Sequence, residues 1–296
     1  MKRHEALSTL ERELSVKYSQ VSARKVALLL LCWALDISHA ELISYDEVLL
    51  SPEELTKLMN ALKDNLLSDK PLAYIIGTVP FLFATLKVRP PVLIPRPETE
   101  LMTDFAIKEL KKLGRREMKI LDLCTGSGCI AISLAQAFAK ADIYACDISE
   151  PALELAKENA SDNMCHTITF IQSDLFAQLP SMTFDMIISN PPYVSTSQWE
   201  NMDPGITQWE DPQAFLAGED GLNIIKNIIS QAPAWLTHEK NRDDQKVPQL
   251  IIECAEYHAH DVVSLMEQAG FKAICHQDDA GKDRYVTGIL TKDMLG

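Results

Sequence analysis

The feature that most limits the fold of this chain is an alternation of strand-like and helical segments, which begins at Pro97. Four apolar, β-branched segments predict strands, at 119–123, 143–146, 167–171 and 184–189. Helical segments are predicted at 97–113, from 128 and from 151. Strands that alternate with helices indicate a parallel sheet with helices on both faces. The tail predicts a helix at 222–232, a strand at 250–254, a helix at 262–269, and an antiparallel pair at 271–275 and 284–289. The predicted fold class is therefore α/β.

The region before this alternation has a different character. Residues 7–67 carry apolar positions at helical spacing, which predicts a small helical N-terminal domain over 1–70. Ser51, Pro52 and Glu54 fit an N-cap, a first-turn proline and a capping-box acid. Strand-like segments at 74–76 and 81–88 predict a β-hairpin linker within 71–95, and a catalytic or binding domain follows over 96–296.

Charge and cysteine content exclude several classes of protein. The chain has 42 acidic and 28 basic residues, a formal net charge of -14, so direct nucleic-acid binding is not expected. Its seven cysteines form no C-x-x-C pair, which predicts reduced thiols and no metal site. The longest apolar run, 26–35, is about half of the ~20 residues that a membrane span needs. These features predict a cytoplasmic protein without a membrane partner.

A glycine-rich turn, Asp122 to Gly128, follows the first predicted strand of the sheet and opens a helix. Glycines let backbone amides approach a ligand closely, and a helix N-terminus adds partial positive charge. Asp147, nineteen residues beyond Gly128, ends the next strand, where a carboxylate can accept hydrogen bonds from ribose hydroxyls. Gly126, Gly128 and Ala131 also match a dinucleotide fingerprint, so a nicotinamide or flavin ligand remains an alternative.

Two further acids bear on the ligand. Asp122 lies beside the turn, where an acid repels a pyrophosphate but favours an ammonium group, so we expect a ligand that ends in an amino acid. Asp174 follows the third strand and is placed either for an adenine edge or as a helix N-cap, and the sequence favours neither.

The segment Asn190-Pro191-Pro192-Tyr193 follows the fourth strand directly. Two prolines fix φ and remove two amide donors, which holds Asn190 and the Pro191 carbonyl in a stiff geometry at the carboxyl end of the sheet. Open α/β sheets bind ligands at that end. Asn190 Oδ1 and the Pro191 carbonyl form a pair of acceptors suited to the two hydrogens of a planar NH2 group. Tyr193 offers a face against which a planar acceptor can lie.

Together these motifs resemble the S-adenosylmethionine-dependent amino-methyltransferases, and most of the chain closely resembles one family of them: the protein-(glutamine-N5) methyltransferases of peptide chain release factors, HemK or PrmC. The segments that carry this resemblance are 71–77 with Phe81, 93–100, 189–193, 218–222 and 281–284. A small helical N-terminal domain also belongs to that family.

The resemblance implies a Rossmann-like sheet, S-adenosylmethionine as cofactor with S-adenosylhomocysteine as product, and methylation of the glutamine in the Gly-Gly-Gln motif of class I release factors. It implies catalytic and substrate-binding roles for Asn190, Pro191, Pro192 and Tyr193. Phe81, ordinarily a core residue in a hairpin, would wall the acceptor pocket, and Glu98 or Thr99 would border the cofactor. The implied cofactor contacts are Asp122, Cys124, Thr125, Gly126, Ser127, Gly128, Asp147, Asp174, Leu175 and Asn190.

The chain departs from the family at three places. Cys124 stands where many members carry a glycine, Leu175 replaces an aromatic residue, and 252–256 lacks a glycine-rich ending. Three other functions remain as alternatives: an adenine methyltransferase of nucleic acids, which needs a basic groove; an NAD-dependent dehydrogenase; and a non-catalytic adaptor that binds release factors.

Overall fold

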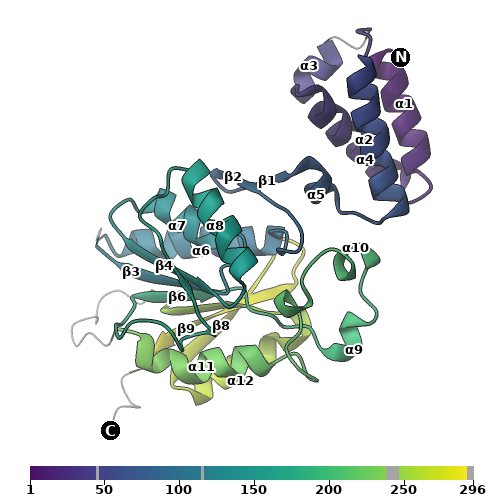
Figure 1. Ribbon diagram of the computed structural model, residues 1–296. Helices are drawn as coiled ribbons and strands as arrows, with labels where there is room; N and C mark the ends of the chain where they lie inside the picture. The colour runs from purple at the N-terminus through teal and green to yellow at the C-terminus, as the bar shows by residue number, and fades with distance from the viewer. Residues whose placement is uncertain (45–46, 115–116, 238–246, 292–296) are drawn as a thin grey trace. The chain divides into compact units, whose positions relative to one another are not determined.

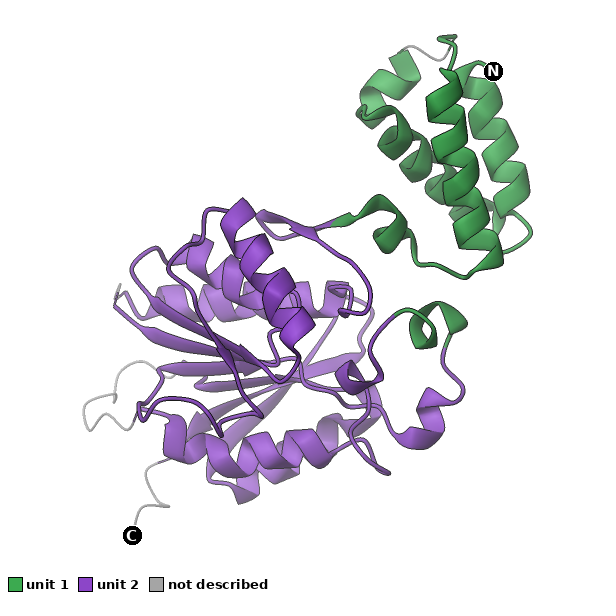
Figure 2. Cartoon of the chain, viewed as in Figure 1, with its two compact units in different colours: residues 1–78, 203–209 green, residues 79–202, 210–296 purple. Residues whose placement is uncertain are grey.

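The computed structural model describes residues 1–44, 47–114, 117–237 and 247–291, and these divide into two compact units (Figure 2). Unit 1 comprises 1–78 and 203–209, and unit 2 comprises 79–202 and 210–296. The division after residue 78 falls inside the linker predicted over 71–95. The segment 203–209 belongs to unit 1, although it lies within the range 96–296 that was predicted as the C-terminal domain. The predicted C-terminal limit, 296, lies outside the described residues.

Unit 1 is helical, as predicted. Its helices are α1 (Arg3–Leu14), α2 (Gln20–Leu35), α3 (His39–Ser44), α4 (Pro52–Leu67), α5 (Leu72–Ile76) and α10 (Pro204–Thr207). The capping box at the start of α4 is confirmed, because Ser51 Oγ accepts a hydrogen bond from Glu54 N at 3.2 Å and Glu54 Oε2 accepts one from Ser51 N at 2.6 Å. Fully buried leucines from α1 and α2, Leu14, Leu30 and Leu31, form the centre of the core.

The strand predicted at 74–76 is wrong, because these residues belong to helix α5. Pro71 stands at the N-cap, and Gly77, with φ of 86°, ends the helix by donating its N–H to Ala73 O at 2.7 Å. The boundary residues therefore decide in favour of a single helical turn over the strand preference of the segment. The predicted hairpin is present just beyond, as β1 (Thr78–Phe81) and β2 (Ala84–Lys87).

Unit 2 is built on one seven-stranded sheet. Its strands are β3 (Lys119–Leu123), β4 (Asp142–Asp147), β5 (Thr169–Gln172), β6 (Met186–Ser189), β7 (Leu250–Glu253), β8 (Phe271–Gln277) and β9 (Asp283–Leu290). The order is β5-β4-β3-β6-β7-β9-β8; the strands from β5 to β7 are parallel, and β9 pairs antiparallel with both β7 and β8. This confirms the predicted α/β class. The chain reverses its direction of winding between β3 and β6, which is where sheets of this kind bind ligands.

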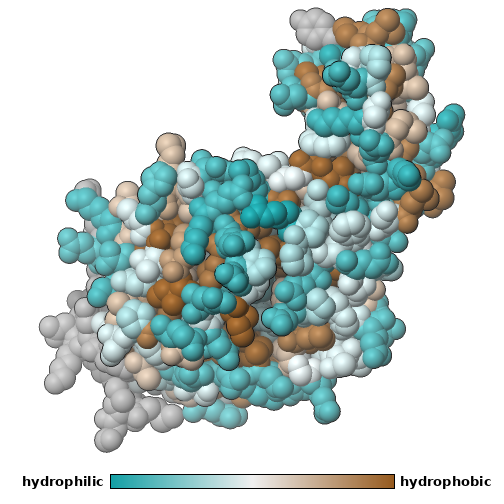
Figure 3. Space-filling view, viewed as in Figure 1, coloured by the Kyte–Doolittle hydropathy of each residue, from teal (hydrophilic) through white to brown (hydrophobic). Residues whose placement is uncertain are grey.

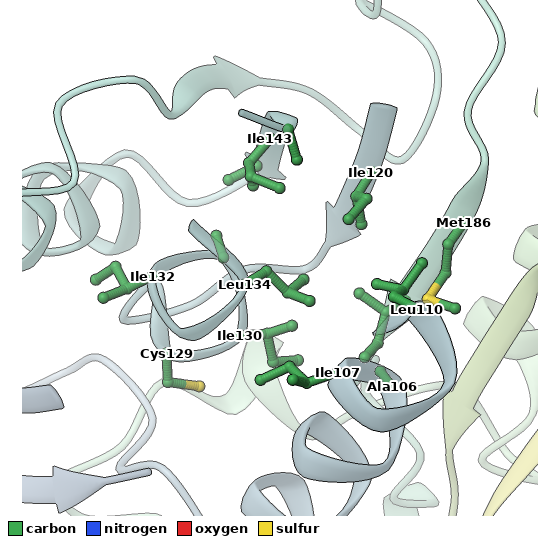
Figure 4. Close-up of a cluster of buried hydrophobic side chains, with 14 of the residues drawn as sticks. Ala106, Ile107, Leu110, Ile120, Cys129, Ile130, Ile132, Leu134, Ile143 and Met186 are labelled. Carbon is green, nitrogen blue, oxygen red and sulfur yellow. The ribbon is translucent and has the colours of Figure 1, made fainter. Parts of the chain in front are cut away.

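Helices cover both faces of this sheet (Figure 1). One face carries α6 (Pro97–Lys112), α7 (Cys129–Ala137) and α8 (Glu150–Asp162), and the other carries α11 (Asn223–Trp235) and α12 (Ala259–Gln268). On the first face, Ile107 and Leu110 of α6 meet Ile130 of α7 above Ile120 of β3, and all four are at most 2% exposed (Figure 4). The long connection between β6 and α11 holds α9 (Thr196–Trp199) and a 3-10 turn at Pro212–Ala214. A second 3-10 turn, at Glu256–His258, lies between β7 and α12.

The surface seen in Figure 3 mixes hydrophilic and hydrophobic residues. Phe83 and Ile148 are among the large hydrophobic side chains that are exposed, at 67% and 55%. Within the described ranges, no helix has both the length and the apolar character needed to cross a bilayer. The same residues include no group of three or more His, Cys, Asp or Glu side chains arranged to hold a metal ion.

Candidate functional site

A cavity of about 410 Å³ lies in unit 2 at the carboxyl ends of β3, β4 and β6. The predicted site residues that line it are Cys124, Thr125, Gly126, Ser127, Asp147, Asp174, Leu175, Asn190 and Pro192. The glycine-rich turn and the start of the Asn-Pro-Pro-Tyr segment, which are 62 residues apart between Gly128 and Asn190, thus contribute to one cavity. Five other predicted site residues are not among the described residues that line this cavity: Phe81, Asp122, Gly128, Pro191 and Tyr193.

Hydrogen bonds from backbone amides tie the glycine-rich turn to the neighbouring strand, β4. Gly126 N donates to Asp147 Oδ2 at 2.8 Å, and Thr125 N donates to Cys146 O at 3.0 Å. Gly126 and Gly128 adopt φ of 55° and 83°, the left-handed region that favours glycine. Asp147 Oδ1 also accepts from Ser149 N at 2.9 Å. Asp147 therefore positions the turn while it lines the cavity, and burial raises the pKa of its carboxyl group.

Asp122 is fully buried behind the turn. Its Oδ2 accepts hydrogen bonds from Thr125 Oγ1 at 2.6 Å and from Ala131 N at 3.1 Å, whereas Oδ1 has no partner among the described residues. Burial, which outweighs these hydrogen bonds, raises the pKa of Asp122 to about 7. Asp122 thus holds the cavity-lining residue Thr125 and does not itself reach the cavity.

The raised pKa of Asp122 predicts a pH dependence of stability. Between about pH 4 and pH 7 the unfolded carboxyl group has lost its proton and the folded one retains it, so the free energy of unfolding falls as pH rises. In Asp122→Asn this part of the slope, at most about 1.4 kcal/mol per pH unit, should disappear. Urea denaturation of both proteins at half-unit pH steps measures the difference. Parallel curves for the two proteins would contradict a protonated Asp122 in the folded state.

Asp174 heads a turn after β5 and lines the cavity. No helix begins there, and Ser173 Oγ, not the Asp174 side chain, accepts the hydrogen bond from Gln178 N at 3.0 Å. The N-cap interpretation of Asp174 is therefore wrong, and a ligand contact stays a prediction. Leu175, beside it, lines the cavity with φ of 49°.

Cys124 adopts φ of 60°, a conformation that costs a non-glycine residue about 1–2 kcal/mol. This explains why glycine suits that position of the turn. Burial raises the pKa of the Cys124 thiol, and Asp147 raises it further, so the thiol is protonated and is not an activated nucleophile. Cys124 lines the cavity as a small side chain.

Substitution of Cys124 tests this backbone strain. Cys124→Gly should change the free energy of unfolding by less than about 1 kcal/mol, because relief of strain offsets the greater freedom of the unfolded chain. Cys124→Val should be less stable than Cys124→Gly by about 1–2 kcal/mol, since a β-branched residue is an outlier at positive φ. Chemical denaturation of the pair provides the comparison, and equal stability would show that the turn does not impose this φ.

The Asn-Pro-Pro-Tyr segment is anchored at both ends. Asn190 Nδ2 donates to Thr99 Oγ1 at 2.9 Å, and the Tyr193 hydroxyl donates to Glu253 Oε1 at 3.4 Å. Pro191 is buried, and Pro192 and Asn190 line the cavity. Tyr193 packs against the core under α11 and α12, and its burial raises the pKa of the phenol.

Phe81 is 1% exposed and packs in the core beside α6 and α7. It therefore has no free surface with which to wall an acceptor pocket, which agrees with its ordinary role in a hairpin. Trp199 packs against Phe215 with ring centroids 5.4 Å apart, and within unit 1 the Trp209 indole donates to Ser68 O at 2.8 Å. Both tryptophans of the long connection thus have intramolecular contacts.

One wall of the cavity was not predicted. It consists of residues from 91–95 and 211–216, and the buried Glu210 connects the two segments. Glu210 Oε2 accepts from Ile94 N at 3.0 Å, its Oε1 pairs with Arg96, and Asp211 N donates to Pro91 O at 2.7 Å. The only local signal for this wall is the segment 93–100, which carries part of the family resemblance in the sequence. The other segment of the wall, 211–216, lies more than a hundred residues away and has no such signal.

Comparison with known proteins identifies both parts of the chain. The family model for the PrmC N-terminal domain matches residues 5–77, and the model for the methyltransferase small domain matches residues 98–206. Among solved structures, the 16S rRNA N2 G1207 methyltransferase of T. thermophilus, in complex with AdoMet and guanosine, is similar with a TM-score of 0.53 and 15% identity. That similarity covers 72% of this chain and 50% of the other, and at this identity it shows the fold.

Curated relatives are more similar in sequence. The release factor glutamine methyltransferase of Thermodesulfovibrio yellowstonii is 33% identical over 89% of this chain and 90% of its own length. The enzyme of the same name from Lactococcus lactis subsp. lactis is 37% identical over 78% of this chain and 82% of its own. With the helical unit, the glycine-rich turn and the Asn-Pro-Pro-Tyr segment all in place, this chain belongs to the release factor glutamine methyltransferase family.

Proposed function

We propose that this protein transfers a methyl group from S-adenosylmethionine to the side-chain amide nitrogen, N5, of the glutamine in the Gly-Gly-Gln motif of class I peptide chain release factors. The observation that carries the proposal is the orientation of Asn190 at the cavity. Its Nδ2 donates a hydrogen bond to Thr99 Oγ1, and its Oδ1 is therefore the atom that can accept a hydrogen bond from an incoming amide. The names of the relatives support the choice of a release factor as substrate.

The residues of the cavity fit this cofactor. A volume of about 410 Å³ is in the range of sites for ligands of its size. Asp147, at the end of β4, keeps free lone pairs with which to accept from ribose hydroxyls, and Asp174 is placed for the adenine edge. The turn Cys124-Thr125-Gly126-Ser127 would follow the rest of the molecule, with Asp122 and Gly128 supporting it from behind. When bound, S-adenosylmethionine supplies an electrophilic methyl group on a sulfonium.

The work of the protein side chains is to orient a weak nucleophile. The nitrogen lone pair of a glutamine amide is conjugated with its carbonyl, a resonance that in peptides gives a rotation barrier of ~18–20 kcal/mol. Asn190 Oδ1 and the Pro191 carbonyl would accept the two amide hydrogens and fix the direction of that lone pair. Each such hydrogen bond contributes only about 1 kcal/mol, whereas holding reactants in a near-attack pose can supply roughly 7–11 kcal/mol. Positioning therefore dominates, and the stiff prolines provide it.

The proposal is tested by incubating the purified protein with methyl-labelled S-adenosylmethionine and a class I release factor. Parallel reactions contain the same factor with its loop glutamine changed to alanine, and a duplex DNA. We expect label on the unaltered factor alone, because the acceptor pair matches a carboxamide and the net charge of -14 disfavours DNA. Label on DNA, or equal label on the altered factor, would overturn the assignment in favour of a nucleic-acid or a different protein substrate.

A further inference from the structure

Glu253, the last residue of β7, has no role in the mechanism above, yet it is one of the most deeply buried acids of unit 2, at 2% exposed. A buried carboxyl group is costly unless neighbours compensate its charge. Strands β6 and β7 are paired with Ser189 opposite Ile252, so Glu253 follows at the level of Asn190. Glu253 thus ends its strand beside the first residue of the Asn-Pro-Pro-Tyr segment.

The contacts of Glu253 reach both ends of that segment. Its Oε1 accepts from the Tyr193 hydroxyl at 3.4 Å. Thr99 is 2% exposed, and its hydroxyl is near enough to the Glu253 carboxyl group to lower its pKa. Thr99 Oγ1 in turn accepts from Asn190 Nδ2 at 2.9 Å. Oε2 of Glu253 has no hydrogen-bond partner among the residues described, so it retains capacity to accept.

The direction of these hydrogen bonds follows from the chemistry of the groups. A hydroxyl has one proton to donate, and an ionised carboxylate can only accept. When the Thr99 proton is directed to Glu253, Thr99 can only accept from Asn190, which turns the Asn190 NH2 group toward Thr99 and its Oδ1 away. Without an obligate acceptor at 253, Thr99 could donate to Oδ1 of a flipped Asn190. A flipped Asn190 would offer NH2 to the acceptor and repel its amide hydrogens.

We propose that Glu253 is a positioning residue for methyl transfer: through Thr99 it fixes which end of the Asn190 carboxamide faces the acceptor, and it holds the Tyr193 hydroxyl directly. This inference rests on the proposed function, since it assigns Asn190 Oδ1 as the atom that receives the glutamine amide. It gives Glu253 no contact with substrate or cofactor.

Protonation of Glu253 should switch this arrangement off. Burial raises its pKa to about 7, although Thr99 and Tyr193 act in the opposite direction. The charged and titratable groups that face it are Glu98 of α6, which raises its pKa, Arg284 of β9, which lowers it, and the thiols of Cys129 and Cys254, whose own raised pKa keeps them neutral. Below about pH 7 the carboxyl group becomes a donor to Thr99, so we expect kcat to fall as pH falls.

Kinetics of Glu253→Gln test the proposal, because glutamine keeps the size of the side chain but can donate to Thr99. We expect kcat to fall about 10- to 100-fold and to lose its dependence on pH between 6 and 8. KM for the release factor and Kd for S-adenosylhomocysteine should change less than about threefold. The exposed Glu256→Gln is the matched control, with unchanged kcat. In a Thr99→Val background, Glu253→Gln should add little further loss, since its effect passes through the same hydroxyl.

A second measurement needs no turnover and separates this proposal from the proposed function. The side-chain NH2 signals of Asn190, assigned by their loss in Asn190→Ala, should shift in the NMR spectrum of Glu253→Gln and titrate near pH 7 in the wild type. If the wild type methylates no release factor, but its Asn190 signals titrate near pH 7 and shift in Glu253→Gln, the proposed function is overturned and the positioning role is retained. Unchanged Asn190 signals in Glu253→Gln, or a loss of kcat that is equally large in the Thr99→Val background, would overturn the positioning role.

Discussion

Asn190→Ala should lose methyl transfer while it keeps its cofactor. Removal of the carboxamide takes away the acceptor that we propose orients the glutamine amide. We expect kcat to fall about 10²- to 10³-fold, the size of effect seen when one preorganised polar group of an active site is removed. The Kd for S-adenosylhomocysteine should change less than about threefold, because Asp147, Asp174 and the glycine-rich turn are untouched. Transfer of labelled methyl to a release factor, with calorimetric titration of S-adenosylhomocysteine, measures the two effects separately.

Asn227→Ala provides the matched control for this experiment. Asn227 lies on the exposed side of α11 and does not line the cavity, so the variant should bind cofactor and turn over like the wild type. Full activity in Asn190→Ala would refute the role given to Asn190. Loss of cofactor binding together with activity would instead indicate that Asn190 supports the shape of the cavity.

Gly128→Ala should lower the free energy of unfolding by about 2–4 kcal/mol. Gly128 caps α7 with φ of 83°, and an added Cβ would lie 3.1 Å from Ala156 Cβ, 3.2 Å from Ala156 Cα and 3.2 Å from Ile132 Cδ1. Ile132 could move slightly, but the backbone of α8 at Ala156 cannot move without shifting the helix. Urea denaturation gives the loss of stability, and titration with S-adenosylhomocysteine should show weaker binding, because the turn before α7 must shift as well.

Gly281→Ala separates the two costs combined in Gly128→Ala. Gly281 has a similar φ of 77°, but an added Cβ there has nothing within 4 Å. This variant should lose only the cost of positive φ, about 1–2 kcal/mol, and its cofactor affinity should not change, because the turn between β8 and β9 lies outside the cavity lining. Equal destabilisation of the two variants would mean that the approach of α7 to α8 adds no cost at Gly128.

Much of the fold could be predicted because the signals are local. Hydrophobic period separates the strand at 119–123 from the helix that begins at Pro97, and both were predicted close to their observed bounds. Ser51 and Glu54 are three residues apart, so their capping box can be recognised from the sequence. The failure at 74–76 has the same origin: aromatic and β-branched residues favour a strand, but Pro71 and Gly77, at the ends of the segment, permit one helical turn.

In the candidate site, too, local motifs could be predicted from the sequence, whereas the position of individual side chains could not. Local sequence was enough to mark the glycine-rich turn, Asp147 and the Asn-Pro-Pro-Tyr segment, because each is a short motif at the end of a strand, and parallel strands bring their carboxyl ends to one edge. The residue type alone did not tell whether a side chain reaches the cavity. Asp122 and Phe81 are both buried and do not line it, while Asp147 does.

By itself, the sequence determined the α/β class, the helical N-terminal region and the motifs that meet at the cavity, since period, turn residues and caps act over a few positions. Only the tertiary structure decided which side chains support those motifs. Thr99 contacts Asn190 across 91 positions of sequence, and Tyr193 contacts Glu253 across 60. Such pairs leave no local pattern, because packing of α6 and β7 against the end of β6, and not neighbourhood in the chain, brings them together.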